Sequence, residues 1–286
     1  MQVIRRGIEL GFAIKQITPN DFDRDWVVAS DFLIFNNFYS FEPKLYHFLL
    51  KAIWEYKKPY VVYSHDHRDV IGEETARIRF ARAWFSHAFF NVFISPMHRD
   101  NFLTYLGEGI KPLYVLTPPV DTDFFYKRAN VERRPRTAVN LTGRLVSSKG
   151  LMNIYKWAIA NSNYKLSVYS KYADGTSGKL LSCRPNVKIL GNVPYKMLPD
   201  IYSEHQYVIH LPVYPEAAGR TIIEGALCGC KPIANEIVGV MSFSEEELPL
   251  SDPRKLKQII ETNVYTFWYN IIRYYQKTKY TRAKEW

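Results

Sequence analysis

Two glutamates and a glycine, Glu216, Gly219 and Glu224, lie between two short apolar runs at residues 208–213 and 231–235. Apolar runs of this length, rich in β-branched residues, are typical of buried parallel strands. The segment between them predicts a helix that begins at Gly219 and ends near residue 229. The two carboxylates therefore flank a helix start at the carboxyl end of a strand, which is where open α/β sheets bind ligands.

This helix start has the chemistry of an anion site. Because Gly219 has no Cβ, the backbone N–H groups of Arg220 and Thr221 can approach a phosphate. Carboxylates on either side, Glu216 and Glu224, would accept hydrogen bonds from sugar hydroxyls. Phosphate beside sugar hydroxyls describes a sugar nucleotide. The ordinary alternative is a helix with Glu224 in water and Glu216 in a surface turn, which a lone pair of glutamates at this spacing also fits.

A second cluster follows another expected strand at residues 137–142. Gly143 permits a tight turn, and Arg144 and Lys149 place two positive charges at the start of the next helix. Two fixed cations at a helix start suit a diphosphate. Charges beside helices are also common on ordinary surfaces, but the glutamate pair downstream makes a shared site the better interpretation.

A third cluster, His65, Asp66, His67 and Asp69, follows an expected strand at residues 59–63. Two histidines near carboxylates can ligate a cation. No further ligand stands at a fixed spacing, however, so a solvated loop is the default reading and we predict no metal.

Composition limits the class of protein. The chain has 286 residues, of which 47% are hydrophobic and 23% charged, and this is ordinary for a globular protein. No apolar run is long enough to span a bilayer and no signal peptide is evident, so we expect a cytoplasmic protein. The three cysteines predict buried thiols rather than disulfides or zinc. The net charge of +10 indicates an anionic partner: a nucleotide sugar, a phosphorylated acceptor, an acidic lipid surface or nucleic acid.

The strand and helix signals alternate along the chain, which predicts an α/β protein with parallel sheets. We expect a helix at residues 3–10, strands at 13–17 and 31–36, and a long aromatic helix at 253–279. The segment 254–286 has eight Lys and Arg against two Glu. A basic aromatic helix of this kind can lie on an anionic membrane or pack against the body of the protein, and apolar spacing favours packing.

Three stretches resemble the retaining GT-B glycosyltransferases of family 4. They are Glu216-x2-Gly219-x4-Glu224-x4-Gly229, Gly143-Arg144-Leu145-x3-Lys149-Gly150 and Pro118-Pro119-Val120-Asp121-x2-Phe124. The resemblance implies two Rossmann-like domains facing a cleft, at residues 1–125 and 126–264, with a C-terminal helix at 265–286 that packs back toward the first domain. The family's first strand and glycine-rich loop are absent here, so the N-terminal domain is expected to be reduced.

The resemblance also implies a function: metal-independent transfer of a sugar from a nucleoside diphosphate sugar, UDP- or GDP-linked, to an acceptor, with retention of configuration. It assigns His65 and Glu216 to the transferred sugar, and Arg144, Lys149, Gly219, Arg220, Thr221 and Glu224 to the donor; no cofactor is implied. His67 is the second choice for the histidine. Two alternatives stay open, a glycosyltransferase acting on DNA bases and a non-catalytic protein that binds sugar nucleotides.

Overall fold

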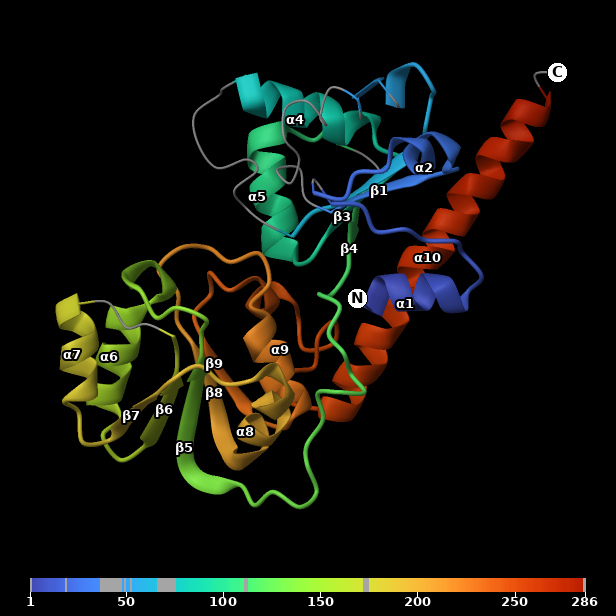
Figure 1. Ribbon diagram of the computed structural model, residues 1–286. Helices are drawn as coiled ribbons and strands as arrows, with labels where there is room; N and C mark the ends of the chain where they lie inside the picture. Colours follow the sequence, from blue (N-terminus) through green and yellow to red (C-terminus); the bar gives the residue numbers. More distant parts are fainter. Residues whose placement is uncertain are drawn as a thin grey trace. The chain divides into compact units, whose positions relative to one another are not determined.

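The computed structural model divides into two compact units (Figure 1). Unit 1 comprises Met1–Leu116 and Asn263–Trp286, and unit 2 comprises Thr117–Thr262. The structure describes residues 2–18, 20–36, 48, 50–51, 53–65, 76–110, 113–171 and 175–284. The two predicted histidine-cluster residues Asp66 and His67 lie outside these ranges, as does Asp69.

Unit 1 contains a parallel sheet in the order β1-β2-β3-β4. Its strands are β1 (Leu33–Asn36), β2 (Tyr60–Tyr63), β3 (Asn91–Phe93) and β4 (Leu113–Val115). The described helices of this unit are α1 (Gln2–Glu9), α2 (Arg24–Ala29), α4 (Ala76–His87), α5 (Pro96–Leu106) and part of α10 (Pro253–Lys284). Pairing of each strand with the next is typical of strands joined by crossover segments.

The strand expected at residues 13–17 is wrong. Residues 13–17 form no strand; the isolated bridge nearby, between Thr18 and Asp21, lies just beyond them. The apolar residues of this segment pack on helices instead. The side chain of Ile14 lies against Gly7 of α1, where the side chain of Trp268 of α10 also packs. A short apolar run cannot by itself distinguish a strand from a segment that packs on helices.

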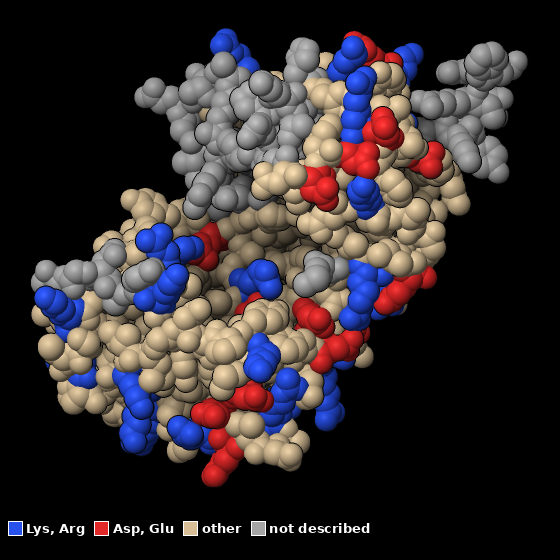
Figure 2. All heavy atoms as spheres, viewed as in Figure 1, with Lys and Arg blue, Asp and Glu red and all other residues tan. Residues whose placement is uncertain are grey.

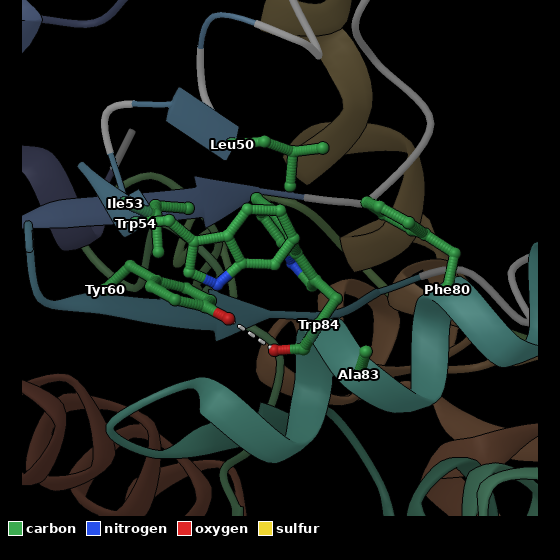
Figure 3. A pocket seen from close by; sticks show the side chains of 7 residues that line it. All are labelled: Leu50, Ile53, Trp54, Tyr60, Phe80, Ala83 and Trp84. Carbon is green, nitrogen blue, oxygen red and sulfur yellow. Dashed lines mark hydrogen bonds between the residues drawn. The ribbon is translucent and has the colours of Figure 1, made fainter.

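The core of unit 1 is aromatic. The ring of Trp84, on α4, lies 4.7 Å from that of Phe35 on β1 and 4.9 Å from that of Tyr60 on β2, measured between centroids. The Tyr60 hydroxyl donates a hydrogen bond of 2.6 Å to the Trp84 carbonyl. Figure 3 shows Tyr60 and Trp84 beside a small pocket whose other lining residues are Leu50, Ile53, Trp54, Phe80 and Ala83. The lining has no charged side chain, so this pocket lacks the groups that a phosphate would need.

Unit 2 contains a five-stranded parallel sheet in the order β7-β6-β5-β8-β9. The strands are β5 (Arg134–Leu141), β6 (Lys165–Tyr169), β7 (Val187–Leu190), β8 (His205–His210) and β9 (Lys231–Ala234). The helices between them are α6 (Leu151–Ala160), α7 (Gly175–Ser182), α8 (Leu198–Glu204) and α9 (Arg220–Leu227), with short 3-10 turns η2 (Ser147–Lys149), η3 (Tyr195–Met197) and η4 (Gly239–Ser242).

Alternate residues of the central strands enter two cores, one on each face of the sheet. Val139 and Val208 pack with residues of α8 and α9, including Tyr202 and Ile222. Ala138 and Ile209 instead pack with residues of α6 and α7, including Ile154 and Leu181. Both faces are therefore covered by helices, which explains why the strands read as continuous apolar runs.

Helix α10 packs through its apolar residues in both units. Leu256 and Ile260 belong to the core of unit 2. In unit 1, the Trp268 indole stacks on Phe12 at 4.8 Å between centroids and donates a hydrogen bond of 2.8 Å to the Val3 carbonyl. None of the helices in the described residues is both long enough and apolar enough to cross a bilayer.

Candidate functional site

The strand order of unit 2 reverses between β5 and β8. The chain first builds outward from β5 through β6 to β7, and it then returns to add β8 on the other side of β5 and β9 beyond it. The carboxyl ends of β5 and β8 lead into two loops, which we name the β5 loop (residues 142–150) and the β8 loop (residues 211–219). Ligands of open α/β sheets bind at such a switch point. The predicted donor-binding residues and Glu216 lie on these two loops and on α9, whereas His65 belongs to unit 1.

The two loops are held against each other by backbone contacts. Gly150 has a φ of +85°, and a Cβ at this position would overlap the carbonyl oxygen of Leu211. The amide of Val213 donates to the Ser148 carbonyl at 3.3 Å. Asn153, at the start of α6, donates from Nδ2 to the Leu211 carbonyl at 3.0 Å. Gly150 is therefore required both for its left-handed conformation and for the close approach of the loops.

The β8 loop is anchored on its other side by the segment after β9. The Glu216 amide donates to the Ile237 carbonyl at 2.9 Å, and the Glu216 carbonyl accepts from the Gly239 amide at 2.8 Å. Gly219 has a φ of +83°, and a Cβ there would overlap the side chain of Val238. These contacts place Glu216 and the first turn of α9 on one rigid framework.

The Glu216 carboxylate has a partner on each oxygen. Lys149, from the β5 loop, donates from Nζ to Oε1. His210, the last residue of β8, lies with Nε2 2.7 Å from Oε2. Partial burial by itself raises the pKa of Glu216, but the hydrogen bonds and charges of His210 and Lys149 outweigh it and lower the pKa to about 2. The carboxylate is thus held ionised between a cation and an imidazole.

His210 is a site residue that the sequence did not reveal. It is the last residue of an apolar strand, and a histidine at such a position is usually an ordinary core residue. The signal that could have found it is its place at the carboxyl end of a buried strand. In the structure the residue is 4% exposed.

Glu224 lies on α9 and is 5% exposed, so the alternative of a solvated Glu224 is wrong. Its Oε1 accepts from Arg220 at 3.2 Å and its Oε2 accepts from the Tyr202 hydroxyl at 3.3 Å. Burial raises the pKa of Glu224, and the contacts with Arg220 and Tyr202 oppose this effect. Arg220, which is 57% exposed at its side chain, thereby presents a positive charge at the start of α9.

Arg144 is exposed on the β5 loop. The loop itself is fixed beside it, because the Leu145 amide donates to the Ser170 hydroxyl at 2.7 Å and the Leu145 side chain is fully buried. The structure thus joins Lys149 directly to Glu216 and Arg220 to Glu224, and it places Arg144 on the same loop as Lys149. On the face seen in Figure 2, basic side chains of unit 2 are interspersed with acidic ones and do not form one continuous basic surface.

Several buried polar atoms around the switch point have no hydrogen-bond partner within the described part of the chain. They are Thr142 Oγ1, His210 Nδ1, Thr221 Oγ1 and Asn235 Oδ1. Thr142 directly follows β5, Asn235 directly follows β9, and Thr221 lies in the first turn of α9. Buried polar groups are nearly always satisfied, and a concentration of unsatisfied ones marks a place where a ligand or water supplies the missing partner.

His65, predicted to face the transferred sugar, lies in unit 1 just after β2. Its Nε2 is 2.8 Å from Asn36 Oδ1, at the end of the neighbouring strand β1, and the side chain is exposed. It is therefore at the carboxyl edge of its own sheet. Across the described ranges, no group of three or more His, Cys, Asp or Glu is arranged to hold a metal ion.

The cysteines follow the sequence expectation in part. Cys228 and Cys230 are buried, and burial raises the pKa of both thiols, that of Cys230 to about 12. Cys183 is exposed, because it lies just beyond α7 at the surface of the sheet's outer helices.

Comparison with solved structures finds similar folds. HepE of Anabaena, in complex with UDP and glucose, matches at 16% identity with a TM-score of 0.58, covering 91% of this chain and 80% of that one. AviGT4, a glycosyltransferase involved in avilamycin A biosynthesis, matches at 11% identity and a TM-score of 0.61, covering 96% and 87%. The catalytic domain of starch synthase IV from Arabidopsis thaliana, bound to ADP and acarbose, matches at 10% identity and a TM-score of 0.58, covering 86% and 73%.

No protein-family model matches this chain, and no curated protein matches its sequence. The fold is that of the GT-B glycosyltransferases, as expected, with one parallel sheet in each unit. The structural matches leave part of HepE and part of the starch synthase IV domain uncovered.

Proposed function

We propose that this protein is a glycosyltransferase that moves a sugar from a nucleoside diphosphate sugar to an acceptor, with retention of configuration and without a metal ion. One observation carries the proposal. Two loops at the switch point of unit 2 hold Lys149, Glu216 and the start of α9 together, and these are the groups that a sugar diphosphate requires. The fold shared with GT-B glycosyltransferases supports the same reaction class.

The donor diphosphate is assigned to the cations. Arg144 and Lys149 neutralise its charge, and the first-turn N–H groups of Arg220 and Thr221 add the positive end of the helix dipole. Fixed positive charge stabilises the nucleoside diphosphate as it leaves, which is the task that a metal ion performs in other enzymes. The Thr221 hydroxyl, which is buried and has no hydrogen-bond partner among the described residues, can donate to a phosphate oxygen.

The two carboxylates are assigned to hydroxyls. Glu216 accepts hydrogen bonds from the transferred sugar, and its negative charge favours an oxocarbenium-like transition state. Glu224 accepts from the ribose, which requires that Arg220 turn away from Oε1. Because the Arg220 side chain is 57% exposed, it can turn into solvent, and the ribose hydroxyl then replaces it as a hydrogen-bond partner of the buried Glu224 carboxylate. Unit 1 is proposed to supply His65 and to hold the acceptor, with front-face attack by the acceptor on the donor sugar.

We place the reaction in the cytoplasm. Helix α10 carries basic residues as well as the apolar residues that pack. Its basic residues would allow the enzyme to bind an anionic membrane surface while it acts in the cytoplasm. The donor is assigned to the UDP- or GDP-sugars; HepE was solved with UDP and glucose.

The first test is a thermal-shift series with UDP-, GDP-, ADP- and dTDP-sugars. A donor at 100 times its Kd stabilises the protein by about 2.7 kcal/mol, which is seen as a higher Tm. Arg144→Ala is expected to weaken the binding of that donor about 10- to 100-fold, because a charge-assisted hydrogen bond contributes about 1.5–3 kcal/mol. Lys188→Ala removes a positive charge from β7, away from the switch point, and serves as the matched control.

The outcome also separates the alternatives. Absence of a shift with every donor would contradict the proposal. Binding without transfer or donor hydrolysis would favour a non-catalytic sugar-nucleotide-binding protein. Activity that persists in EDTA supports metal independence. Tight binding of duplex DNA that weakens steeply with salt would favour a DNA-base glycosyltransferase.

A further inference from the structure

The two partners of the Glu216 carboxylate differ in how freely they can leave it. The His210 side chain is 5% exposed and projects from the last position of β8. The Lys149 side chain is 48% exposed and projects from the β5 loop. A buried imidazole is confined by the close packing around it, whereas a half-exposed lysine can turn on its flexible stem at little cost.

The chemistry of the two contacts differs as well. A carboxylate only accepts hydrogen bonds, so His210 Nε2 carries the hydrogen and donates it to Oε2. His210 Nδ1 is buried and unpaired in the described residues, so the contact with Glu216 is the one polar interaction that orients this ring there. Lys149 has three N–H groups that can donate hydrogen bonds. In the proposed function they can bind either Glu216 or a phosphate of the sugar nucleotide.

We infer that Lys149 is an exchangeable partner of Glu216 and His210 a fixed one: an incoming diphosphate takes Lys149 from Glu216, while His210 keeps the carboxylate in position for the sugar. This inference rests on the proposed function. It makes His210 a positioning residue that acts through Glu216, and it makes the Lys149–Glu216 ion pair the resting state of the site.

The exchange couples the two halves of the donor. Glu216 Oε1 loses its hydrogen-bond partner when the phosphate binds Lys149. A hydroxyl of the sugar then donates a hydrogen bond to this oxygen in place of Lys149. A nucleoside diphosphate without a sugar breaks the ion pair and leaves that oxygen without replacement. The site therefore favours a complete sugar nucleotide over the nucleoside diphosphate that remains after transfer, and this preference helps the product to leave.

Calorimetric titration with UDP and with GDP at one ionic strength tests the competition. Glu216→Gln releases Lys149 without changing the size of the side chain, so it is expected to bind the nucleoside diphosphate about 3- to 10-fold more tightly than wild type. Lys149→Met is expected to bind the nucleoside diphosphate at least tenfold more weakly than wild type. The affinity of His210→Gln is expected to stay within about twofold of wild type, because His210 does not bind phosphate. Weaker or unchanged binding by Glu216→Gln would overturn the inference.

Glu236→Gln is the matched control. Glu236 is an exposed carboxylate just after β9 in the same unit, and its removal changes the net charge by the same amount. Unchanged affinity in this variant assigns the gain in Glu216→Gln to the ion pair. An equal gain in both variants would overturn the inference in favour of a general effect of charge.

The ionisation of Glu216 gives a readout that does not depend on transfer. The titratable groups that face its carboxylate are Lys149 from the β5 loop and His210 from β8, and both lower the pKa of Glu216. Observed by NMR of labelled glutamate side chains, Glu216 should titrate near 2 in wild type and higher in Lys149→Met and in His210→Gln. Saturating UDP or inorganic pyrophosphate should likewise raise the wild-type pKa, because each takes Lys149 away.

The two proposals fail in different ways. If UDP or GDP binds without moving the Glu216 titration, the exchange is wrong and the proposed function stands. If pyrophosphate moves the titration but no sugar nucleotide binds, the proposed function is wrong and the exchange stands. A Glu216 titration near 4.5 in wild type would overturn the resting ion pair itself.

Discussion

The two units carry sheets of the same type but are stabilised in different ways. Both sheets are wholly parallel. In unit 1 the core beside the sheet is built from large rings, with Trp84 in contact with the rings of Phe35 and Tyr60. In unit 2 the central strands pack mainly aliphatic residues, and the loops above them are shaped by glycines at positive φ, Gly150 and Gly219.

The difference shows how each unit uses its residues. Aromatic rings supply a large apolar area from few residues, which suits a sheet whose described strands have only three or four residues each. Glycines let backbone segments touch, and that contact is what brings charged side chains from two loops to one place. Unit 1 should therefore be sensitive to loss of side-chain volume, and unit 2 to added volume at its loops.

The largest effect is expected from Trp84→Ala, which removes the ring at the centre of the unit 1 core. A buried aromatic replaced by alanine costs about 3–5 kcal/mol. Hydrogen exchange measured by mass spectrometry should show faster exchange of the β2 and β3 amides, with β5 and β8 much less affected. Trp54→Ala is the control, since Trp54 lines the same pocket but is 57% exposed, and it should cost about 0.5 kcal/mol. An equal increase in amide exchange rates in both sheets would contradict the separation of the two cores.

Gly150→Ala is expected to have the next largest effect. The left-handed conformation alone costs about 1–2 kcal/mol for a non-glycine residue, and overlap of the new Cβ with Leu211 adds a shift of the β8 loop, for about 3 kcal/mol in total. Gly11→Ala in unit 1 is the matched control, because Gly11 has a φ of +90° but no atom near its Cβ position. Urea unfolding should show the smaller loss, about 1–2 kcal/mol, for Gly11→Ala. Similar losses in the two variants would show that the loops are not in forced contact.

The smallest effects are expected from removing one buried hydroxyl in each unit. Tyr60→Phe deletes a hydrogen bond to the Trp84 carbonyl and should cost about 1 kcal/mol at all pH values below 8. Tyr202→Phe deletes a donor to the buried Glu224 carboxylate and should cost somewhat more, about 1.5 kcal/mol, when Glu224 is ionised.

The pH dependence distinguishes these two variants. Burial raises the pKa of Glu224 in the folded protein above its unfolded value of 4.5, so the folded state holds this proton more tightly. Its contribution to stability is fully present below the unfolded pKa and is lost as pH rises through the folded pKa. The Tyr202 bond lowers that pKa, so Tyr202→Phe should raise it and deepen the loss of stability on its alkaline side, whereas Tyr60→Phe should run parallel to wild type. Parallel curves for both variants would show that Tyr202 does not stabilise the ionised carboxylate.

Much of unit 2 could be predicted because its elements have local signals. Its predicted strands and the helix at Gly219 appear within a few residues of their expected places, since buried parallel strands are continuous apolar runs and turn glycines mark their ends. Unit 1 was harder. Residues 13–17 have the composition of a strand but pack on helices, a distinction that depends on which partners surround the segment.

The site shows the same division. The types and spacing of Arg144, Lys149, Glu216 and Glu224 indicated phosphate and hydroxyl chemistry, because two clusters of charged residues each followed a predicted strand of the same sheet. Spacing did not reveal that Lys149 binds Glu216, that Tyr202 binds Glu224, or that His210 completes the cluster. The first contact joins two loops that are 67 residues apart in the sequence, the second joins α8 to α9, and the third depends on how the β8 loop folds back onto the end of β8.

By itself, the sequence determined the α/β class, the positions of the glycines that shape the loops, and which charged side chains those loops carry. The tertiary structure alone decided which charges meet. Local periodicity and turn chemistry act over a few residues, whereas the order β7-β6-β5-β8-β9 sets which loops become neighbours, and that order depends on burial of both faces of the sheet.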